Sequence, residues 1–493
     1  FLDNIAKVQP QVVGFSNYSW NTNLNLHIGR ETRKALPESM IVGGGPNIDD
    51  DEDWRRRFLK KHDYLDFLIV DGGEEPFTEL IKWRNEARGD KSKLPMNLLW
   101  LEGNEVCKTD LRPLEKKITD IVSPYLEGHL DKFLEAGMVP MFESNRGCPF
   151  PCTFCAWGMA SHDIVSRLNI DNTIEEIKYI GKRTRVNNWI ICDANFGMLK
   201  RDIEIAKAIR EAHDKYQYPK TCQMWLSKNT SYRNLEIANI LGDMILPTMA
   251  IQSMDEEVLS NINRDNISSE TYYKYQKRFH SMGSTTYSDL IIPLPMEKLS
   301  THLDGLRKLF DVGVDIIQNH NMRMLPGCEM NTPITRKKFN FKTKYRLIHG
   351  DSGIYKTRDD EDIKSFELEE SLRSTSTMLE KDLFKLREIH FFIEFAWNLK
   401  IYSDLLQIAK NFKINQLDLI LNFFNNTKKN KKLTSFWKKF NKESKNEWFN
   451  NRKDAEKFFS KKNNFNKLVN QEYEKINILF AIIIMKDYKR TFD

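Results

Sequence analysis

Three of the seven cysteines lie within eight residues of one another, in the stretch SNRGCPFPCTFCAWGM at 144–159. They are Cys148, Cys152 and Cys155, so their spacing is C-x3-C-x2-C. Thiolates are soft anionic ligands that suit iron–sulfur clusters, zinc or copper. A cubane cluster held entirely by protein needs four thiolates, so three would leave one iron open to an exogenous ligand. The prolines and aromatic residues of the stretch would keep the loop compact and shield such a cluster from water.

Two plainer interpretations stay open, namely a structural zinc site and three unliganded thiols. His162 could be a fourth zinc ligand. However, structural zinc sites usually combine two separated cysteine pairs, which this chain lacks. The ligand count therefore favours the cluster.

The cysteine loop follows the first of six segments with strand character, and helical patterns separate the six. Six consecutive β/α units predict a partial, parallel (β/α)6 barrel of the TIM type, with functional residues in the loops after its strands. The segments lie near 142–146, 188–193, 222–227, 247–252, 285–292 and 316–323.

The first ninety residues also alternate strand and helix, with strands at 11–16, 40–46 and 66–76. This alternation predicts an α/β domain with a doubly wound, Rossmann-like parallel sheet. Such sheets bind ligands at the carboxyl ends of their strands. The residues that fall at those ends are Ser16, Gly43, Gly44, Gly45, Gly72, Gly73 and Glu74.

The chain therefore divides into an α/β domain, a barrel and a helical carboxyl-terminal region. The expected segments are the first domain at 1–90, a connection with a possible hairpin at 91–140, the barrel at 141–335, a barrel-closing linker at 336–385 and the helical region at 386–493.

The cysteine spacing directly after a first strand, with Phe154 before the third cysteine, resembles the radical S-adenosylmethionine superfamily. In that family the three thiolates hold a [4Fe-4S] cluster, whose open iron chelates S-adenosylmethionine. Reductive cleavage of this cofactor gives a 5′-deoxyadenosyl radical. The resemblance implies further cofactor contacts after later strands, from Asp193, Asn195, Gln252, Ser253, Arg264, Pro326 and Gly327.

Some of these positions have a structural alternative. Asn195 and Ser253 could cap the helices that follow them, and Arg264 could be an ordinary surface residue. The turn after the fifth strand also departs from the family, because Pro293 and Met296 stand where relatives have small residues. The departure affects the expected contacts of that turn and leaves the cluster expectation unchanged.

The motifs VVGFSNYSW, IVGGGP and LIVDGGEEPFTEL, in that order before such a barrel, resemble the cobalamin-binding domain of cobalamin-dependent radical enzymes. The resemblance implies that the strand-end residues of the first domain hold cobalamin. The β/α unit that carries a cobalt-ligating histidine in many cobalamin proteins is not in this chain. The glycine turns could instead bind another phosphate-bearing ligand, or the domain could serve docking or architecture.

Taken together, the resemblances imply methyl transfer to an unactivated carbon or phosphorus of a small-molecule substrate, with an electron donor such as flavodoxin or ferredoxin. A radical rearrangement, epimerisation or oxidation without methyl transfer is the alternative within enzymes. From another class, the chain could be a zinc-stabilised binding protein whose basic tail contacts nucleic acid, which we consider the weaker hypothesis.

Charge and hydropathy limit the setting. The net charge is +6, and residues 427–493 hold 18 Lys and Arg against 8 Asp and Glu. We interpret this tail as a solvated helical appendage and expect that its removal leaves cofactor cleavage intact. The longest apolar run, INILFAIIIM at 476–485, is shorter than the ~20 residues that span a bilayer. An odd number of irregularly spaced cysteines favours a reducing compartment, so we expect a cytoplasmic protein without a membrane span.

Overall fold

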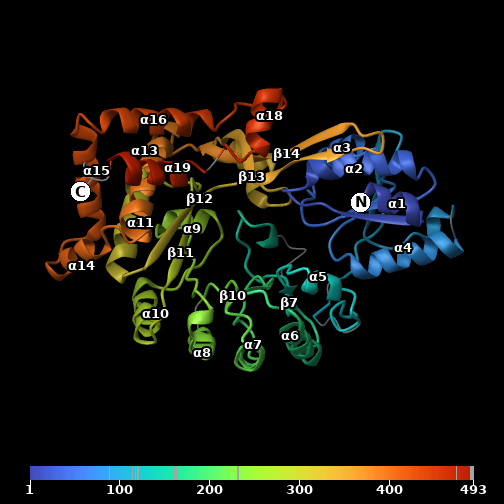
Figure 1. Cartoon of the computed structure of the whole chain (residues 1–493), viewed down its shortest axis with the longest axis horizontal. Coiled ribbons are helices and arrows are strands. Elements are labelled where there is room, and N and C mark those ends of the chain that lie inside the picture. Colours follow the sequence, from blue (N-terminus) through green and yellow to red (C-terminus); the bar gives the residue numbers. More distant parts are fainter. Residues whose placement is uncertain are drawn as a thin grey trace.

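The computed structural model describes residues 1–87, 89–113, 115–116, 118, 121–158, 164–229, 232–473 and 475–488. An amino-terminal α/β unit lies at one side, a row of β/α units forms the lower centre, and carboxyl-terminal helices lie beside and above that row (Figure 1). None of the helices in the described ranges has the length and hydropathy needed to span a bilayer.

The first unit is built on one sheet with the strand order β1-β2-β3-β4-β5. Strands β1 to β3 are parallel, and β4 and β5 continue the sheet as an antiparallel hairpin. The sheet therefore extends past residue 90, into the segment expected as a connection. The strand bounds are β1 Val12–Ser16, β2 Met40–Gly44, β3 Phe67–Ile69, β4 Leu98–Glu102 and β5 Glu105–Lys108.

Helices cover both faces of this sheet because its strands are apolar on both sides. Val13 and Ile41 pack with α1 and α2, and Leu68 packs with α3. Met40 and Val42 face the opposite way, toward α4. The strand order does not reverse within the described residues, so the unit has the layers of a doubly wound sheet without a reversal of strand order. The helices are α1 Leu2–Val8, α2 Thr22–Ala35, α3 Glu52–Lys61 and α4 Glu74–Glu86.

The β/α units follow as two parallel groups of strands. Strands β10, β9 and β6 form one sheet, and β11 pairs with β12 in another. The fourth expected strand contributes two bridges, Thr248 to Tyr287 and Gln252 to Leu290. Within the described residues these strands do not close into a barrel. Their bounds are β6 Met141–Phe142, β9 Asn188–Ile191, β10 Thr221–Gln223, β11 Tyr287–Ile292 and β12 Ile316–Asn321.

Alternate residues of these strands form the core against an outer row of helices. Trp189, Leu290 and Ile292 are buried with helix residues such as Ile177 and Ile209. The other face of each strand is left to line the space that the strands surround. The helices are α5 Asp131–Glu135, α6 Ile170–Arg183, α7 Asp202–Tyr216, α8 Tyr232–Leu241, α9 Glu256–Asn261, α10 Ser269–Ser281, α11 Leu299–Val312 and α12 Pro333–Lys338.

A long antiparallel hairpin, β13 (Lys342–Lys356) and β14 (Asp362–Ser374), occupies most of the expected linker at 336–385. It links the two units (Figure 1). The carboxylate of Glu367 accepts the backbone N–H of Asn23 in α2 at 2.6 Å, while Leu372 donates its N–H to the carbonyl of Met322, just after β12. The hairpin therefore fixes the amino-terminal unit relative to the β/α units.

The carboxyl-terminal helices are part of the core, so the interpretation of residues 427–493 as a solvated appendage is wrong. Phe436, Trp437, Phe440 and Phe480 are buried in the same apolar cluster as α11 and α13, and the rings of Phe391 and Phe440 lie 4.8 Å apart. Most of the lysines between these aromatic residues, such as Lys438, Lys439 and Lys442, reach solvent. The helices are α13 Glu380–Ile393, α14 Ser403–Asn411, α15 Gln416–Lys429, α16 Thr434–Asn446, α17 Arg452–Phe459, α18 Lys462–Val469 and α19 Ile476–Ile483.

Candidate active site

The cysteine loop is held in place by backbone hydrogen bonds to two distant segments. It follows the short strand β7 (Asn145–Arg146), which pairs with β8 (Ser166–Arg167). Within the loop, Thr153 donates its N–H to the carbonyl of Ile262 at 3.1 Å and accepts the N–H of Met330 at 2.8 Å. These bonds place the loop among the segments that follow later strands.

Side chains from three later loops contact the cysteines, as expected of a site at the carboxyl ends of parallel strands. The Asn195 amide donates to the Cys148 sulfur at 3.1 Å, and the Lys228 ammonium donates to the Cys152 sulfur at 2.8 Å. The Arg264 guanidinium lies 3.9 Å from the same sulfur. Asn195 therefore serves the cysteine loop rather than capping α7, and Arg264 is buried, so its interpretation as a surface residue is wrong.

The donor set fits an anionic iron–sulfur cluster. All seven cysteines are free thiols, and burial raises the pKa of Cys155. A thiolate at that position therefore needs a cation or a metal to stabilise it, and Lys228 and Arg264 supply positive charge beside the loop. His162 lies outside the described residues, and within those residues no three His, Cys, Asp or Glu side chains converge on a single metal ion.

Asp193 organises the approach to the loop. It is fully buried and accepts the N–H groups of Ser144 at 2.7 Å and Asn145 at 3.2 Å, together with the hydroxyl of Ser144 and the amide of Asn145. Burial raises its pKa to about 7, against the opposing effect of these hydrogen bonds. Its hydrogen bonds thus fix the backbone three and four residues before Cys148, and its contact with S-adenosylmethionine remains a prediction.

The fourth-strand segment presents one unused polar atom. Gln252 has a left-handed backbone, with φ of 62°, and its buried side-chain carbonyl has no hydrogen-bond partner among the described residues. Such an orphaned acceptor is suited to a donor on a bound molecule. Ser253 accepts the N–H of Asp255 at 3.2 Å, but Asp255 is the residue that caps α9, by accepting the N–H of Val258 at 3.0 Å, so the interpretation of Ser253 as a helix cap is wrong.

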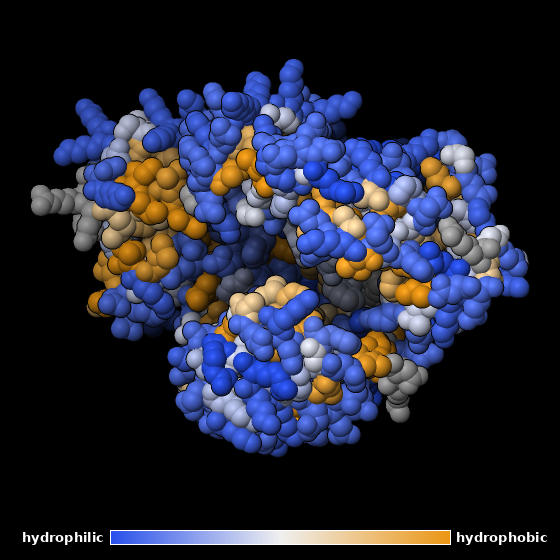
Figure 2. Space-filling view, turned by 45° about the vertical axis from the view of Figure 1, so that its right-hand side comes forward, coloured by the Kyte–Doolittle hydropathy of each residue, from blue (hydrophilic) through white to orange (hydrophobic). Residues whose placement is uncertain are grey.

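The strand-end loops of the two units face each other. Gly327, with φ of 73°, donates its N–H to the Asp49 carboxylate at 3.2 Å, and a Cβ at this position would lie 3.0 Å from the carbonyl of Ile48. Glycine at 327 thus permits the loop after β12, which also holds Pro326, to approach the loop after β2. Figure 2 shows a hollow between the parts of the molecule.

An ion pair also joins the strand-end loops of the two units, which we call their rims. Arg146, two residues before Cys148, pairs with Glu74 at 2.9 Å and with Glu143 at 2.8 Å. Burial acts to raise the pKa of Glu74, but the hydrogen bond and charge of Arg146 outweigh it and hold the pKa below its usual value. Glu74 and the neighbouring Gly72 therefore lie at the cysteine-bearing rim of the β/α units.

The remaining glycine turns differ in what they do. Gly45 has φ of 110°, and a Cβ there would lie 2.7 Å from the carbonyl of Asn17, so only glycine fits. Gly43 packs against Leu65 and Leu68, inside the sheet layer, whereas no atom of the described residues lies within 4 Å of a Cβ added to Gly73. Ser16 uses its carbonyl to accept the Asn21 and Asn25 amides. The contact of these residues and Gly44 with cobalamin remains a prediction.

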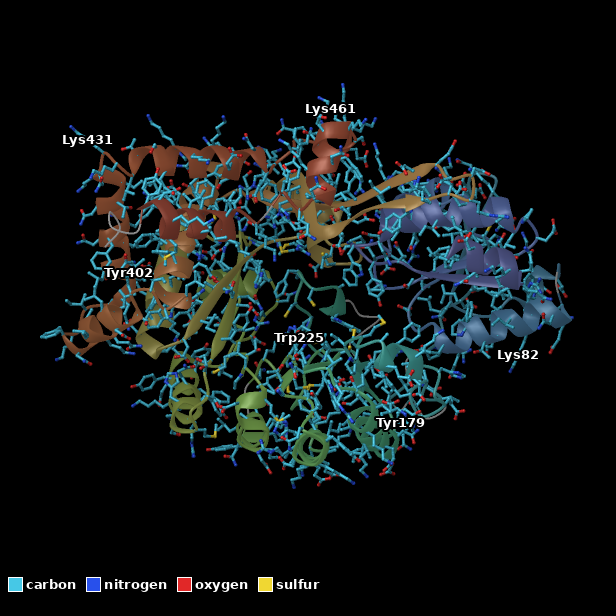
Figure 3. The ribbon with its side chains drawn as sticks, in the orientation of Figure 1. Lys82, Tyr179, Trp225, Tyr402, Lys431 and Lys461 are labelled. Carbon is cyan, nitrogen blue, oxygen red and sulfur yellow. The ribbon has the colours of Figure 1, made fainter. Side chains whose placement is uncertain are left out.

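The inner faces of the strands carry polar and aromatic groups that the sequence did not single out. Trp225, after β10, is 45% exposed and lies at the centre of the molecule (Figure 3). On β11 and β12, one carboxylate oxygen of Asp289 accepts both the Tyr287 hydroxyl and the His320 imidazole, the latter at 2.8 Å. The His320 side chain is half exposed.

Comparison with known proteins accounts for this arrangement. Residues 142–318 match the Radical SAM superfamily. The chain belongs to the radical SAM superfamily. It is 31% identical over 346 residues to the cobalamin-dependent radical SAM methyltransferase TokK of Streptomyces tokunonensis. It is 32% identical over 352 residues to 2-(S-pantetheinyl)-carbapenam-3-carboxylate methyltransferase of Streptantibioticus cattleyicolor. These matches confirm the resemblance seen in the sequence.

The alignments cover 68% and 69% of this chain, which spans about half the length of these two relatives. Solved structures share the fold. The methyltransferase TsrM of Kitasatospora setae superposes with a TM-score of 0.55 at 13% identity, over 68% of this chain and 67% of that one. The cobalamin-dependent S-adenosylmethionine radical enzyme OxsB superposes with a TM-score of 0.54 at 14% identity, over 99% of this chain and 74% of that one.

Proposed function

We propose that this radical SAM protein is a cobalamin-dependent methyltransferase that acts on a small molecule. The observation that carries the proposal is the position of the cysteine loop, at the rim where the β/α units meet the strand ends of the amino-terminal unit. Two relatives named as methyltransferases, each matched over two thirds of this chain, support it.

Cys148, Cys152 and Cys155 would hold a [4Fe-4S] cluster, which when bound would offer an open iron to S-adenosylmethionine and supply the electron for its cleavage. The protein's own residues would orient the bound cofactor and exclude water from it. Asn195 and Lys228 donate to the thiolates, and the unpaired carbonyl of Gln252 would accept from the cofactor's amino group or ribose.

Cobalamin would lie against the turns of the amino-terminal sheet, where it would supply a methyl group that a carbon or phosphorus radical can accept. The pair between Glu74 and Arg146 would set the separation of the two rims, and the hairpin β13–β14 would keep the amino-terminal unit in place. A one-electron donor such as flavodoxin or ferredoxin would complete the system, in the cytoplasm, where free thiols persist.

The substrate would enter the space between Trp225 and the Tyr287–Asp289–His320 group. The exposed indole offers an apolar face, while His320 offers a hydrogen bond whose direction Asp289 fixes. One relative's name specifies a carbapenam carboxylate, so a molecule of that class is the first probe to test.

The test is anaerobic turnover with S-adenosylmethionine that carries a deuterated methyl group, with and without cobalamin. The proposal predicts 5′-deoxyadenosine and a deuteromethylated product that forms only with cobalamin. Deoxyadenosine with a changed but unmethylated product would instead support a radical rearrangement or oxidation.

A further inference from the structure

A groove of about 600 Å³ lies on the outer surface of the β/α units, between α8 and α10. Its walls include Tyr232 and Leu235 from α8, and Lys274, Tyr275, Lys277 and Arg278 from α10. Tyr232 is 75% exposed and meets Tyr275 edge to face at 6.4 Å. The groove thus combines exposed aromatic rings with three cationic side chains.

The cations of the groove are available to a partner. Lys274 pairs with Glu270 on its own helix at 2.8 Å, but both side chains are more than two thirds exposed, so the pair is weak and can be exchanged. Lys277 lies over the Tyr273 ring, and the Arg278 guanidinium has no ion-pair partner among the described residues. Aromatic residues and arginine are enriched at protein interfaces. The positive charge of the two lysines and the arginine favours an acidic partner.

Both helices that wall the groove begin a few residues after a side chain that contacts the cysteine loop. Lys228 contacts the Cys152 sulfur and lies four residues before Tyr232, the first residue of α8. Arg264 lies against the same sulfur and five residues before Ser269, the first residue of α10. A molecule seated in the groove would therefore contact two helices that each start within five residues of a side chain at the Cys152 sulfur.

We propose that this groove docks an acidic one-electron donor protein that reduces the cluster. The inference rests on the proposed function, which needs such a donor. In each encounter the donor would lose one electron and the cluster would gain it. The cluster would then pass this electron on to the sulfonium as the carbon–sulfur bond of S-adenosylmethionine breaks. An acidic protein fits better than nucleic acid, because three cations beside two tyrosines make a small mixed patch rather than a phosphate-binding stripe.

The experiment uses the full chain, reconstituted without oxygen, and measures deoxyadenosine formation at low ionic strength with two reductants. One is reduced flavodoxin, an acidic protein, and the other is dithionite-reduced methyl viologen, which is small enough to reach the cluster without docking. The test variant is Lys274→Glu/Lys277→Glu/Arg278→Glu, and all three side chains are exposed. The matched control, Lys438→Glu/Lys439→Glu/Lys442→Glu on α16, has the same change of charge on another exposed surface.

If the donor docks in the groove, the flavodoxin-driven rate of the groove variant should be lower than that of wild type by about tenfold or more. Added salt should reduce the difference between these two rates, because it screens the attraction. The viologen-driven rate should be unchanged. The α16 control should keep both rates. The docking site alone is overturned if the groove variant keeps the wild-type flavodoxin-driven rate, or if the α16 control loses as much of that rate as the groove variant does. It is also overturned if the groove variant loses binding to an oligonucleotide while its flavodoxin-driven rate is unchanged. A wild-type protein that cleaves no S-adenosylmethionine with either reductant overturns the proposed function itself.

Discussion

Asp193 offers a quantitative test of how the cysteine loop is positioned. Its carboxylate is buried and has a pKa of about 7, whereas an exposed aspartate has a pKa of about 3.9. Because the folded-state pKa is the higher one, the contribution to stability is fully present below about pH 4 and is lost as pH rises through about 7. Between about pH 5.5 and 8.5 the loss should be about 2 kcal/mol.

The substitutions separate this charge effect from the hydrogen bonds. Asp193→Asn keeps the shape of the side chain and one acceptor oxygen but cannot ionise. The free energy of unfolding of this variant should therefore not show the fall of about 2 kcal/mol between about pH 5.5 and 8.5. Asp193→Ala leaves the buried N–H groups of Ser144 and Asn145 without an acceptor, at roughly 1–3 kcal/mol each. The alanine variant should therefore be less stable than wild type by about 4 kcal/mol at low pH.

The assay is urea-induced unfolding of cluster-free protein, followed by circular dichroism at both pH values. Glu367, whose pKa burial also raises to about 7, contributes equally to every variant and cancels in the comparison. A wild-type pH profile parallel to that of Asp193→Asn would refute the reasoning, because the buried carboxyl would then carry no titration between the two pH values.

Three further predictions concern the cluster, the rim and the core. Asn195→Leu removes the amide that donates to Cys148, so the reduction potential of the reconstituted cluster should fall, and an unchanged potential in an EPR-monitored titration would contradict that contact. Arg146→Met leaves Glu74 and Glu143 without their cation. Since these groups are partly exposed, the free energy of unfolding measured by thermal unfolding should fall by about 1–2 kcal/mol. Glu74→Gln in the same background should restore part of this loss. Phe440→Ala should cost about 3–5 kcal/mol in urea unfolding, whereas exposed Lys439→Ala should cost almost nothing; equal effects would return α16 to the role of an appendage.

The cysteine motif was predictable because its chemistry is encoded by local spacing. Three thiols at fixed intervals after a strand define a candidate ligand set without any knowledge of distant contacts. Similarly, the alternation of apolar strands with helical patterns located the strands at 11–16, 40–46 and 285–292 within a few residues of their observed ends.

Features that depend on long-range contacts were missed. Lys228 stands in an unremarkable SKN stretch, and only the fold brings its ammonium to Cys152, 76 positions earlier in the chain. The hairpin β13–β14 carries many charged residues, so its strand pattern is weak in sequence, and its apolar residues Leu347, Phe366 and Leu368 are buried against distant residues of α17 and α18. The carboxyl-terminal aromatic residues are separated by lysines and asparagines, whose charge conceals a buried face with helical period.

The most direct measurement is the iron and sulfide content of protein reconstituted without oxygen, together with its reductive cleavage of S-adenosylmethionine. The account predicts about four of each element per chain in the wild type, cleavage to deoxyadenosine, and loss of both in the Cys148→Ala/Cys152→Ala/Cys155→Ala variant. Colourless wild-type protein that holds one zinc and leaves the cofactor intact would contradict it.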